Sequence, residues 1–280
     1  MRIDAHQHFW QPLRGDYDWM PKDNATLNRP YSPADLGDHL SAAGVDGTVL
    51  IQAAATVDET EYMLGLADAT PFIKGVVGWI DFESPAQLGV LKRLAAHPKF
   101  LGVRPMIQDI PDLNWMLRDD IQWAFQALID LDLSFDALGF PQHIPNFLKL
   151  VKRYPALRVV YDHCMKPQIH VQRAGEDAFT NWAEGMTKLA DQTGGFCKLS
   201  ALATEAGDGW RFEDLQPFAT HVLKCFGPER VMFGSDWPVC NLATDYASWH
   251  AFVQRLVTPL GTAAEADVFG GTARRFYRLD

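Results

Sequence analysis

The sequence has few cysteines and no long apolar run. Its four cysteines, none in C-x-x-C spacing, are too few among 280 residues for a disulfide framework. They predict reduced, mostly buried thiols and a cytoplasmic protein. The chain enters a strand pattern almost at once, which predicts no signal peptide, and no apolar run could span a bilayer. We therefore expect no membrane association.

Positive charge and glycine-rich phosphate loops are also scarce. The net charge of −10 argues against a nucleic-acid partner, whose phosphates require a basic surface. No dinucleotide fingerprint or P-loop follows any apolar run. What is present is 48% hydrophobic residues and 21% charged residues, a composition typical of a folded chain with a large core.

Short apolar runs alternate with amphipathic stretches along the whole chain. Eight strands are predicted: Ile3–Ala5, Gly47–Gln52, Ile73–Ile80, Gly102–Met106, Ser134–Ala137, Val159–Asp162, Phe196–Ser200 and Val231–Gly234. Helices are predicted at Pro33–Ala43, Glu59–Ala69, Pro85–Ala95, Ile121–Leu131, Ile144–Tyr154, Phe179–Thr193, Leu215–Phe226, Tyr246–Leu256 and Ala263–Tyr277. Eight βα units without a linker predict one domain over 1–280, a TIM-like (β/α)8 barrel, with a doubly wound sheet as the alternative.

The most informative motif is His6-x-His8 at the end of the first predicted strand. Residues two apart on a strand point to the same side, so the two imidazoles share a face. Paired imidazoles can bind a metal or polarise a carbonyl, although they can also be satisfied core histidines. Active sites of barrels lie at the carboxyl ends of the strands, which favours a functional role for the pair.

Further polar residues follow other predicted strands. Asp236 ends the eighth strand, which neighbours the first in a closed barrel, and is predicted to be a general base or metal ligand rather than a turn cap. His163 ends the sixth strand beside Asp162, which could orient a neighbour. Arg104 lies in an apolar strand, where a cation is costly unless it is paired, and Asp136 is a candidate partner.

Weaker candidates surround this set. A long segment, Gln11–Tyr31, follows the first strand and has the length and aromatic content of a loop that packs over a pocket. Its Trp19, together with Asn114, Lys166 and Trp237, could bind substrate hydroxyls. The other strand-end candidates are Gln52, Asp81 and Ser200.

Taken together, these residues give the sequence a resemblance to a known family. It resembles the amidohydrolase superfamily, in the branch that contains sugar lactonases and 2-pyrone-4,6-dicarboxylate lactonase, and is most similar to the L-fuconolactonase and L-rhamnonolactonase group. The resemblance covers nearly the whole chain. It rests on Asp4–Trp10, Gly102–Arg104, Asp162–Pro167, Lys198–Ser200, Gly234–Pro238 and Gly271–Tyr277.

The resemblance implies a distorted (β/α)8 barrel that opens a lactone ring by hydrolysis. Many members of the superfamily hold two divalent metals, bridged by a carboxylated lysine on the fourth strand, with a further histidine on the fifth. This chain has Arg104 and Asp136 on those strands instead. At most one ion, zinc, is therefore expected, and the branch includes members that work without a metal. The ligands would be His6, His8, His163 and Asp236.

The expected reaction is the opening of an L-fuconolactone or a related aldonolactone to the sugar acid. Asp236 would activate water, the three histidines would polarise the carbonyl, and Arg104 would bind a substrate oxygen or help to stabilise the oxyanion. Two alternatives remain open from the sequence. One is a zinc-dependent non-oxidative decarboxylase of the same superfamily, and the other is a barrel that binds a sugar acid without catalysis.

Overall fold

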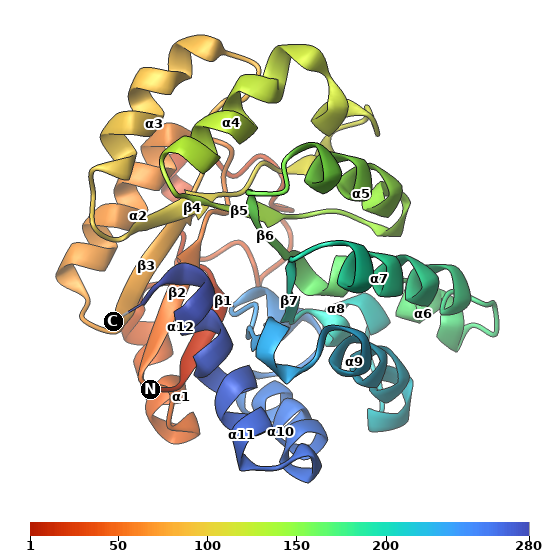
Figure 1. The fold of residues 1–280 in the computed structure, drawn as a ribbon. Coiled ribbons are helices and arrows are strands. Elements are labelled where there is room, and N and C mark those ends of the chain that lie inside the picture. The colour runs from red at the N-terminus through yellow and green to blue at the C-terminus, as the bar shows by residue number, and fades with distance from the viewer. Residues whose placement is uncertain (280) are drawn as a thin grey trace.

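Eight parallel strands form the centre of the molecule, and their order around the sheet is their order along the chain (Figure 1). The computed structural model describes residues 1–279. The strands are β1 (Ile3–Gln7), β2 (Gly47–Ile51), β3 (Ile73–Gly78), β4 (Phe100–Val103), β5 (Ser134–Ala137), β6 (Arg158–Tyr161), β7 (Phe196–Leu199) and β8 (Val231–Phe233). This order confirms the (β/α)8 barrel and contradicts the doubly wound alternative, in which the strand order reverses.

Helices follow every strand and cover the outside of the barrel (Figure 1). They are α1 (Pro33–Ala43), α2 (Val57–Ala69), α3 (Leu88–Ala95), α4 (Gln122–Asp130), α5 (Ile144–Arg153), α6 (Ile169–Arg173), α7 (Thr180–Gln192), α8 (Leu202–Ala206), α9 (Phe212–Phe226), α10 (Tyr246–Val257), α11 (Thr262–Ala266) and α12 (Thr272–Tyr277). Helix α1 starts as expected, with Ser32 and Asp35 forming a capping box and Pro33 in the first turn. Among the described residues, no helix is both long enough and apolar enough to cross a membrane.

Three predictions of secondary structure were wrong. Helices α6 and α8 were not predicted, because five residues are too short to show a helical period. Strand β4 ends at Val103, so Arg104 follows the strand instead of lying within it. The continuous helix expected over Ala263–Tyr277 is broken into α11, a wide turn at Asp267–Gly271, and α12.

Buried apolar residues form two clusters, one inside the barrel and one between the strands and the surrounding helices. Inward side chains of alternate strand residues, such as Val49 and Ile51, pack with Ala273, Phe276 and Tyr277 of α12. Helix α12 therefore fills the end of the barrel at which the strands begin. That leaves the opposite end, where the strands finish, available for a site.

The barrel closes between β8 and β1 at their carboxyl ends. The Asp236 N–H donates to the His6 carbonyl at 2.8 Å, and the His8 N–H donates to the Trp237 carbonyl at 2.7 Å. These two hydrogen bonds place the residues after β8 directly beside the histidine pair. Closure of the sheet thus brings together two motifs that are 228 residues apart.

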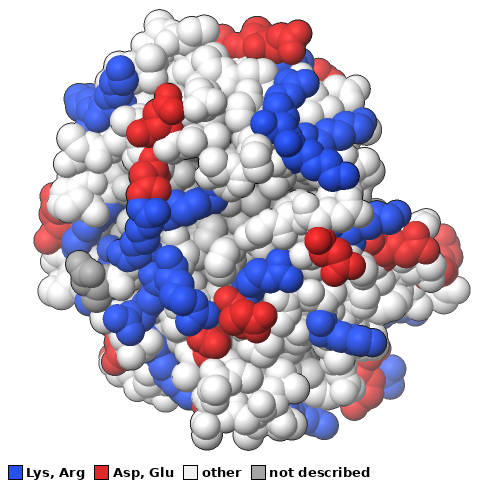
Figure 2. All heavy atoms as spheres, viewed as in Figure 1, with Lys and Arg blue, Asp and Glu red and all other residues white. Residues whose placement is uncertain are grey.

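Acidic and basic side chains lie next to one another on the face that carries both termini (Figure 2). Ion pairs such as Arg275–Asp267, at 2.7 Å, occur near this end of the barrel. This face therefore carries charges of both signs.

Candidate active site

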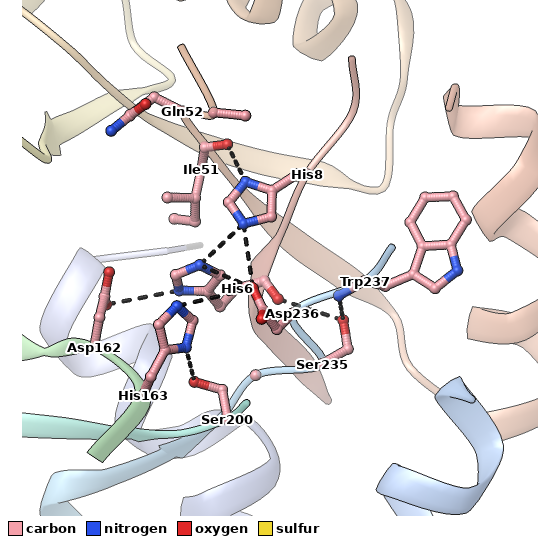
Figure 3. Close-up of polar contacts among 12 residues, drawn as sticks. His6, His8, Ile51, Gln52, Asp162, His163, Ser200, Ser235, Asp236 and Trp237 are labelled. Carbon is pink, nitrogen blue, oxygen red and sulfur yellow. Dashed lines mark hydrogen bonds and ion pairs between the residues drawn. The ribbon is translucent and has the colours of Figure 1, made fainter. Parts of the chain in front are cut away.

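The two histidines at the end of β1 converge, as the strand period predicted. His6 Nε2 and His8 Nε2 are 3.2 Å apart, and both rings are buried (Figure 3). His8 Nδ1 lies 2.8 Å from the Ile51 carbonyl, which can only accept, so Nδ1 carries the proton and Nε2 presents a lone pair. The register of β1 against β2 shifts between Asp4 and Gln7, an irregularity of the kind that re-aims side chains.

Asp236 lies opposite this pair, in a left-handed backbone conformation with φ of 57°. Its Oδ1 is 3.3 Å from His8 Nε2, 3.6 Å from His6 Nε2 and 3.8 Å from His163 Nε2. Burial opposes ionisation, but the nearby His163 and the contact with His8 outweigh it and lower the pKa of Asp236 below its usual value. The carboxylate is therefore ionised at neutral pH, as a general base must be.

His163 is presented by a turn of left-handed helix after β6. Four consecutive non-glycine residues, His163–Lys166, have φ between 48° and 58°. Such a conformation costs about 1–2 kcal/mol per residue and must be held by its surroundings. Trp182 Nε1 donates to the Cys164 carbonyl at 2.8 Å, and the Lys166 N–H donates to the His163 carbonyl at the same distance.

All three imidazoles are neutral at neutral pH. Burial lowers the pKa of His8 and holds the pKa values of His6 and His163 well below the usual value. The positive charge of Lys198 lowers the pKa of His6 further. Each neutral ring can donate one hydrogen bond and offer one lone pair, and Asp236 remains the ionised group among these four residues.

Arg104 has a different partner from the one expected. Its Nη1 is 3.4 Å from Asp162 Oδ2 and its Nη2 donates to the Gln52 carbonyl, whereas Asp136 pairs with Lys198 and with Tyr277. The Asp136 interpretation was therefore wrong, because Lys198 and Tyr277 occupy the Asp136 carboxylate. Gln52 also donates to the Arg104 carbonyl and so supports the arginine from two sides.

Lys198 and Tyr277 are buried polar residues of the site region that the sequence reasoning missed. Lys198 Nζ is 2.5 Å from Asp136, 3.0 Å from Asp162 and 3.2 Å from His6 Nδ1. Tyr277 of α12 donates to Asp136 at 2.6 Å. Burial opposes ionisation of Asp162, but the charges of Lys198 and Arg104 outweigh it and lower its pKa. The signal that could have found Lys198 is the one that identified Arg104, a cation in an apolar strand run.

A cavity of about 320 Å³ opens above these groups. Of the predicted residues, it is lined by His8, Arg104, His163, Asp236, Trp19 and Lys166. His6 lies in contact with His8 and is fully buried. The remaining lining residues were not predicted: Trp10, Ala53, Met106, Gln108, Asp109, Leu138 and Val239.

Two expected substrate contacts lie elsewhere. Trp237 does not line this cavity and is buried against the rings of Phe9 and Tyr31. Asn114 also lies outside the cavity lining, and its side-chain oxygen accepts from Asn146 at 3.2 Å. Trp19 of the long loop after β1 does reach the cavity, where its Nε1 donates to the Ala53 carbonyl at 2.6 Å.

The donor atoms suit a single divalent cation. The bare His8 Nε2 and the ionised Asp236 Oδ1 are two acceptors 3.3 Å apart, an arrangement that a cation between them would satisfy. Ligand atoms of His6, His163 and Asp236 also lie within 4.8 Å of one another. Imidazole nitrogen and carboxylate oxygen are ligands that zinc accepts.

Comparison with known proteins agrees with this geometry. The chain matches the family model described as Amidohydrolase over residues 3–279. It is 41% identical to an L-fucono-1,5-lactonase of Burkholderia ambifaria, over 100% of this chain and 96% of that protein. It is 35% identical to an L-fucono-1,5-lactonase of Burkholderia multivorans, with the same coverage.

Solved structures give the same result. The crystal structure of an amidohydrolase from Burkholderia multivorans with bound zinc has a TM-score of 0.92 and 35% identity, and the match covers 100% of both chains. A 2,6-dihydroxybenzoate decarboxylase, at 13% identity and a TM-score of 0.67, shares the fold alone. The family model and these relatives extend over essentially all of the barrel, and the chain therefore belongs to the amidohydrolase family.

Proposed function

We propose that this chain hydrolyses a sugar-derived lactone, an L-fuconolactone or a related aldonolactone, to the sugar acid. The observation that carries the proposal is an ionised, buried Asp236 facing three neutral imidazoles at the base of a cavity. The two L-fucono-1,5-lactonases at 41% and 35% identity support the substrate class.

Ring opening needs a base, a polarised carbonyl and an acid. Asp236 takes a proton from water as the water attacks the carbonyl, and it returns that proton to the ring oxygen as the ring opens. The imidazoles and Arg104 stabilise the charge that develops on the carbonyl oxygen. Lys166 and Trp19 line the same cavity and are the groups that bind the sugar hydroxyls.

The metal that suits this donor set is zinc, held by His6, His8, His163 and Asp236. When bound, such an ion polarises a carbonyl and lowers the pKa of water. A lactone is a reactive cyclic ester, so a site with one metal or with none is chemically adequate. An amide would be a harder substrate for the same residues.

The substitution that tests this proposal is Asp236→Asn, assayed by proton release from a panel of aldonolactones. The wild-type enzyme is expected to open an L-fuconolactone, and Asp236→Asn is expected to lose at least about 100-fold in kcat because the base is gone. The matched control is Asp81→Asn, since Asp81 also follows a strand but accepts from the Glu83 N–H outside the cavity lining. Assays after chelation, with and without added zinc, test whether the ion is needed.

Two results would contradict the proposal. A correctly folded Asp236→Asn variant with near-normal rates would show that Asp236 is not the general base. Release of carbon dioxide from an aromatic acid, with no action on any lactone, would favour the decarboxylase. Against that alternative, both cations of the cavity already face carboxylates, Arg104 at 3.4 Å from Asp162 and Lys166 at 3.6 Å from Glu205.

A further inference from the structure

A buried lysine contacts the side of His6 that faces away from the cavity. Lys198 lies on β7 with a side chain that is 0% exposed, and its Nζ is 3.2 Å from His6 Nδ1. We propose that Lys198 is a positioning residue that fixes His6 in the tautomer with its proton on Nε2. The assignment makes His6 a hydrogen-bond donor toward His8, which has the opposite tautomer and is the acceptor.

The first argument comes from the surroundings of the ammonium group. A lysine has three N–H donors and no acceptor. Lys198 Nζ has hydrogen-bond contacts with Asp136 Oδ2 at 2.5 Å and His6 Nδ1 at 3.2 Å, and it forms an ion pair with Asp162 Oδ1 at 3.0 Å. If Nδ1 carried the proton, a buried ammonium would lose one acceptor and would meet an N–H instead. Burial without a partner is costly for any donor, and more so for a charged one.

The second argument comes from the opposite side of the ring. His8 donates from Nδ1 to the Ile51 carbonyl, so its Nε2 has a lone pair that needs a donor. His6 Nε2 lies 3.2 Å from that atom, and a proton on His6 Nε2 supplies the donor. The hydrogen bonds then run in one direction, from Lys198 through His6 and His8 to Ile51.

Arg104 is consistent with this direction. Its Nη1 is 3.3 Å from His6 Nε2, but a neutral imidazole has only one lone pair and cannot accept from both Lys198 and Arg104. Arg104 has other acceptors, Asp162 Oδ2 for Nη1 and the Gln52 carbonyl for Nη2. Lys198 therefore takes the lone pair of His6, and Arg104 donates elsewhere.

The tautomer has a consequence for metal binding. With its proton on Nε2 and donated to His8 Nε2, His6 has no free lone pair on Nε2. The same proton must move to Nδ1 before Nε2 can hold a metal. Asp162 Oδ1, 3.6 Å from Nδ1, is the carboxylate that would accept that N–H. Lys198 thus makes His6 a poor metal ligand and a good hydrogen-bond donor.

The direct test is ¹⁵N NMR of the metal-free wild-type enzyme labelled at histidine, which needs no substrate. Signals are assigned by difference spectra of His6→Asn and His8→Asn. We expect His6 to show a bare Nδ1 and a protonated Nε2, with the reverse pattern for His8. A protonated Nδ1 on His6 would overturn the proposal whatever the enzyme's substrate is.

Zinc affinity, measured by calorimetry, gives an independent readout. The variant Lys198→Met/Asp136→Asn removes the cation together with one carboxylate, so that no unpaired charge is created at Asp136. Its zinc affinity is expected to rise about 10-fold or more, the size of effect that groups contacting a metal ligand have. Tyr277→Phe, which changes a contact to Asp136 but not to His6, is the control and should bind zinc as the wild type does. A folded double variant with unchanged or weaker zinc affinity would contradict the proposal.

Discussion

At the scale of single residues, Glu59 links the stability of the site region to pH. Its carboxylate is 0% exposed and accepts from the N–H groups of Ala53 and Ala54, in the turn that carries Ala53 to the cavity. Burial raises the pKa of Glu59 from 4.5 to about 8, against the opposing effect of those two N–H groups. The folded protein therefore keeps a proton that the unfolded chain releases above pH 4.5.

This difference predicts a loss of stability as the pH rises. Below pH 4.5 both states hold the proton, and between pH 4.5 and 8 only the folded state does. The free energy of unfolding should then fall by up to about 1.4 kcal/mol per pH unit from this group. Glu59→Gln stays neutral, so its denaturation midpoint should lack that slope, while Glu61→Gln on the exposed side of α2 should keep it. Equal slopes for wild type and Glu59→Gln in urea titrations would contradict the assigned pKa.

The residues that could be predicted from the sequence are those whose strand ends meet in any closed barrel. His6, His8, His163 and Asp236 each follow from a polar residue at a strand end and from the rule that those ends share one face. The pairing of Arg104 with Asp162 depends on Lys198 and Tyr277 occupying Asp136, which strand assignment alone does not supply. Lys198 needed the further step of asking what a lysine inside an apolar strand could pair with.

At the scale of elements, two local conformations decide where site residues point. The left-handed turn His163–Lys166 has no glycine, so no sequence signal for positive φ marks it. It is held by tertiary contacts such as the one from Trp182 on α7. The break before α12 has a clearer origin, because a side chain at Gly270 would lie 2.3 Å from the Met1 carbonyl.

That close approach predicts the effect of Gly270→Ala. The new methyl group would meet backbone atoms of Met1 and Arg2, so the chain before β1 or the turn before α12 must shift. We expect a loss of about 1–3 kcal/mol in the free energy of unfolding, typical of overpacking. Gly89→Ala in α3 is the control, since nothing lies within 4 Å of its added methyl group and it should be neutral or stabilising by up to about 1 kcal/mol. Equal stability of the two variants by thermal denaturation would show that β1 and the turn are not tightly packed.

At the scale of the whole molecule, the closed barrel separates stability from function. Helix α12 fills the end where the strands begin, and Tyr277 extends from it to Asp136 in the interior. The other end carries the cavity with Asp236 and the imidazoles. The number of βα units allowed the barrel, with a site at the carboxyl ends of its strands, to be predicted. The filling of the opposite end by α12 could not be predicted, because it depends on a break in a segment whose sequence pattern indicates one continuous helix.

The net charge of the molecule predicts how salt affects its substrate and its product. A lactone is neutral, so the field of a protein of charge −10 neither attracts nor repels it, and kcat/KM should change less than about two-fold between about 0.01 and 0.2 M salt. The sugar acid product is an anion that the whole molecule repels when the screening length is long. Product inhibition should therefore strengthen as salt rises, because screening removes the long-range repulsion. Initial rates with and without added product, measured across that salt range, separate the two effects. A salt dependence of kcat/KM as strong as that of product inhibition would mean that the substrate itself is charged and would contradict a neutral lactone.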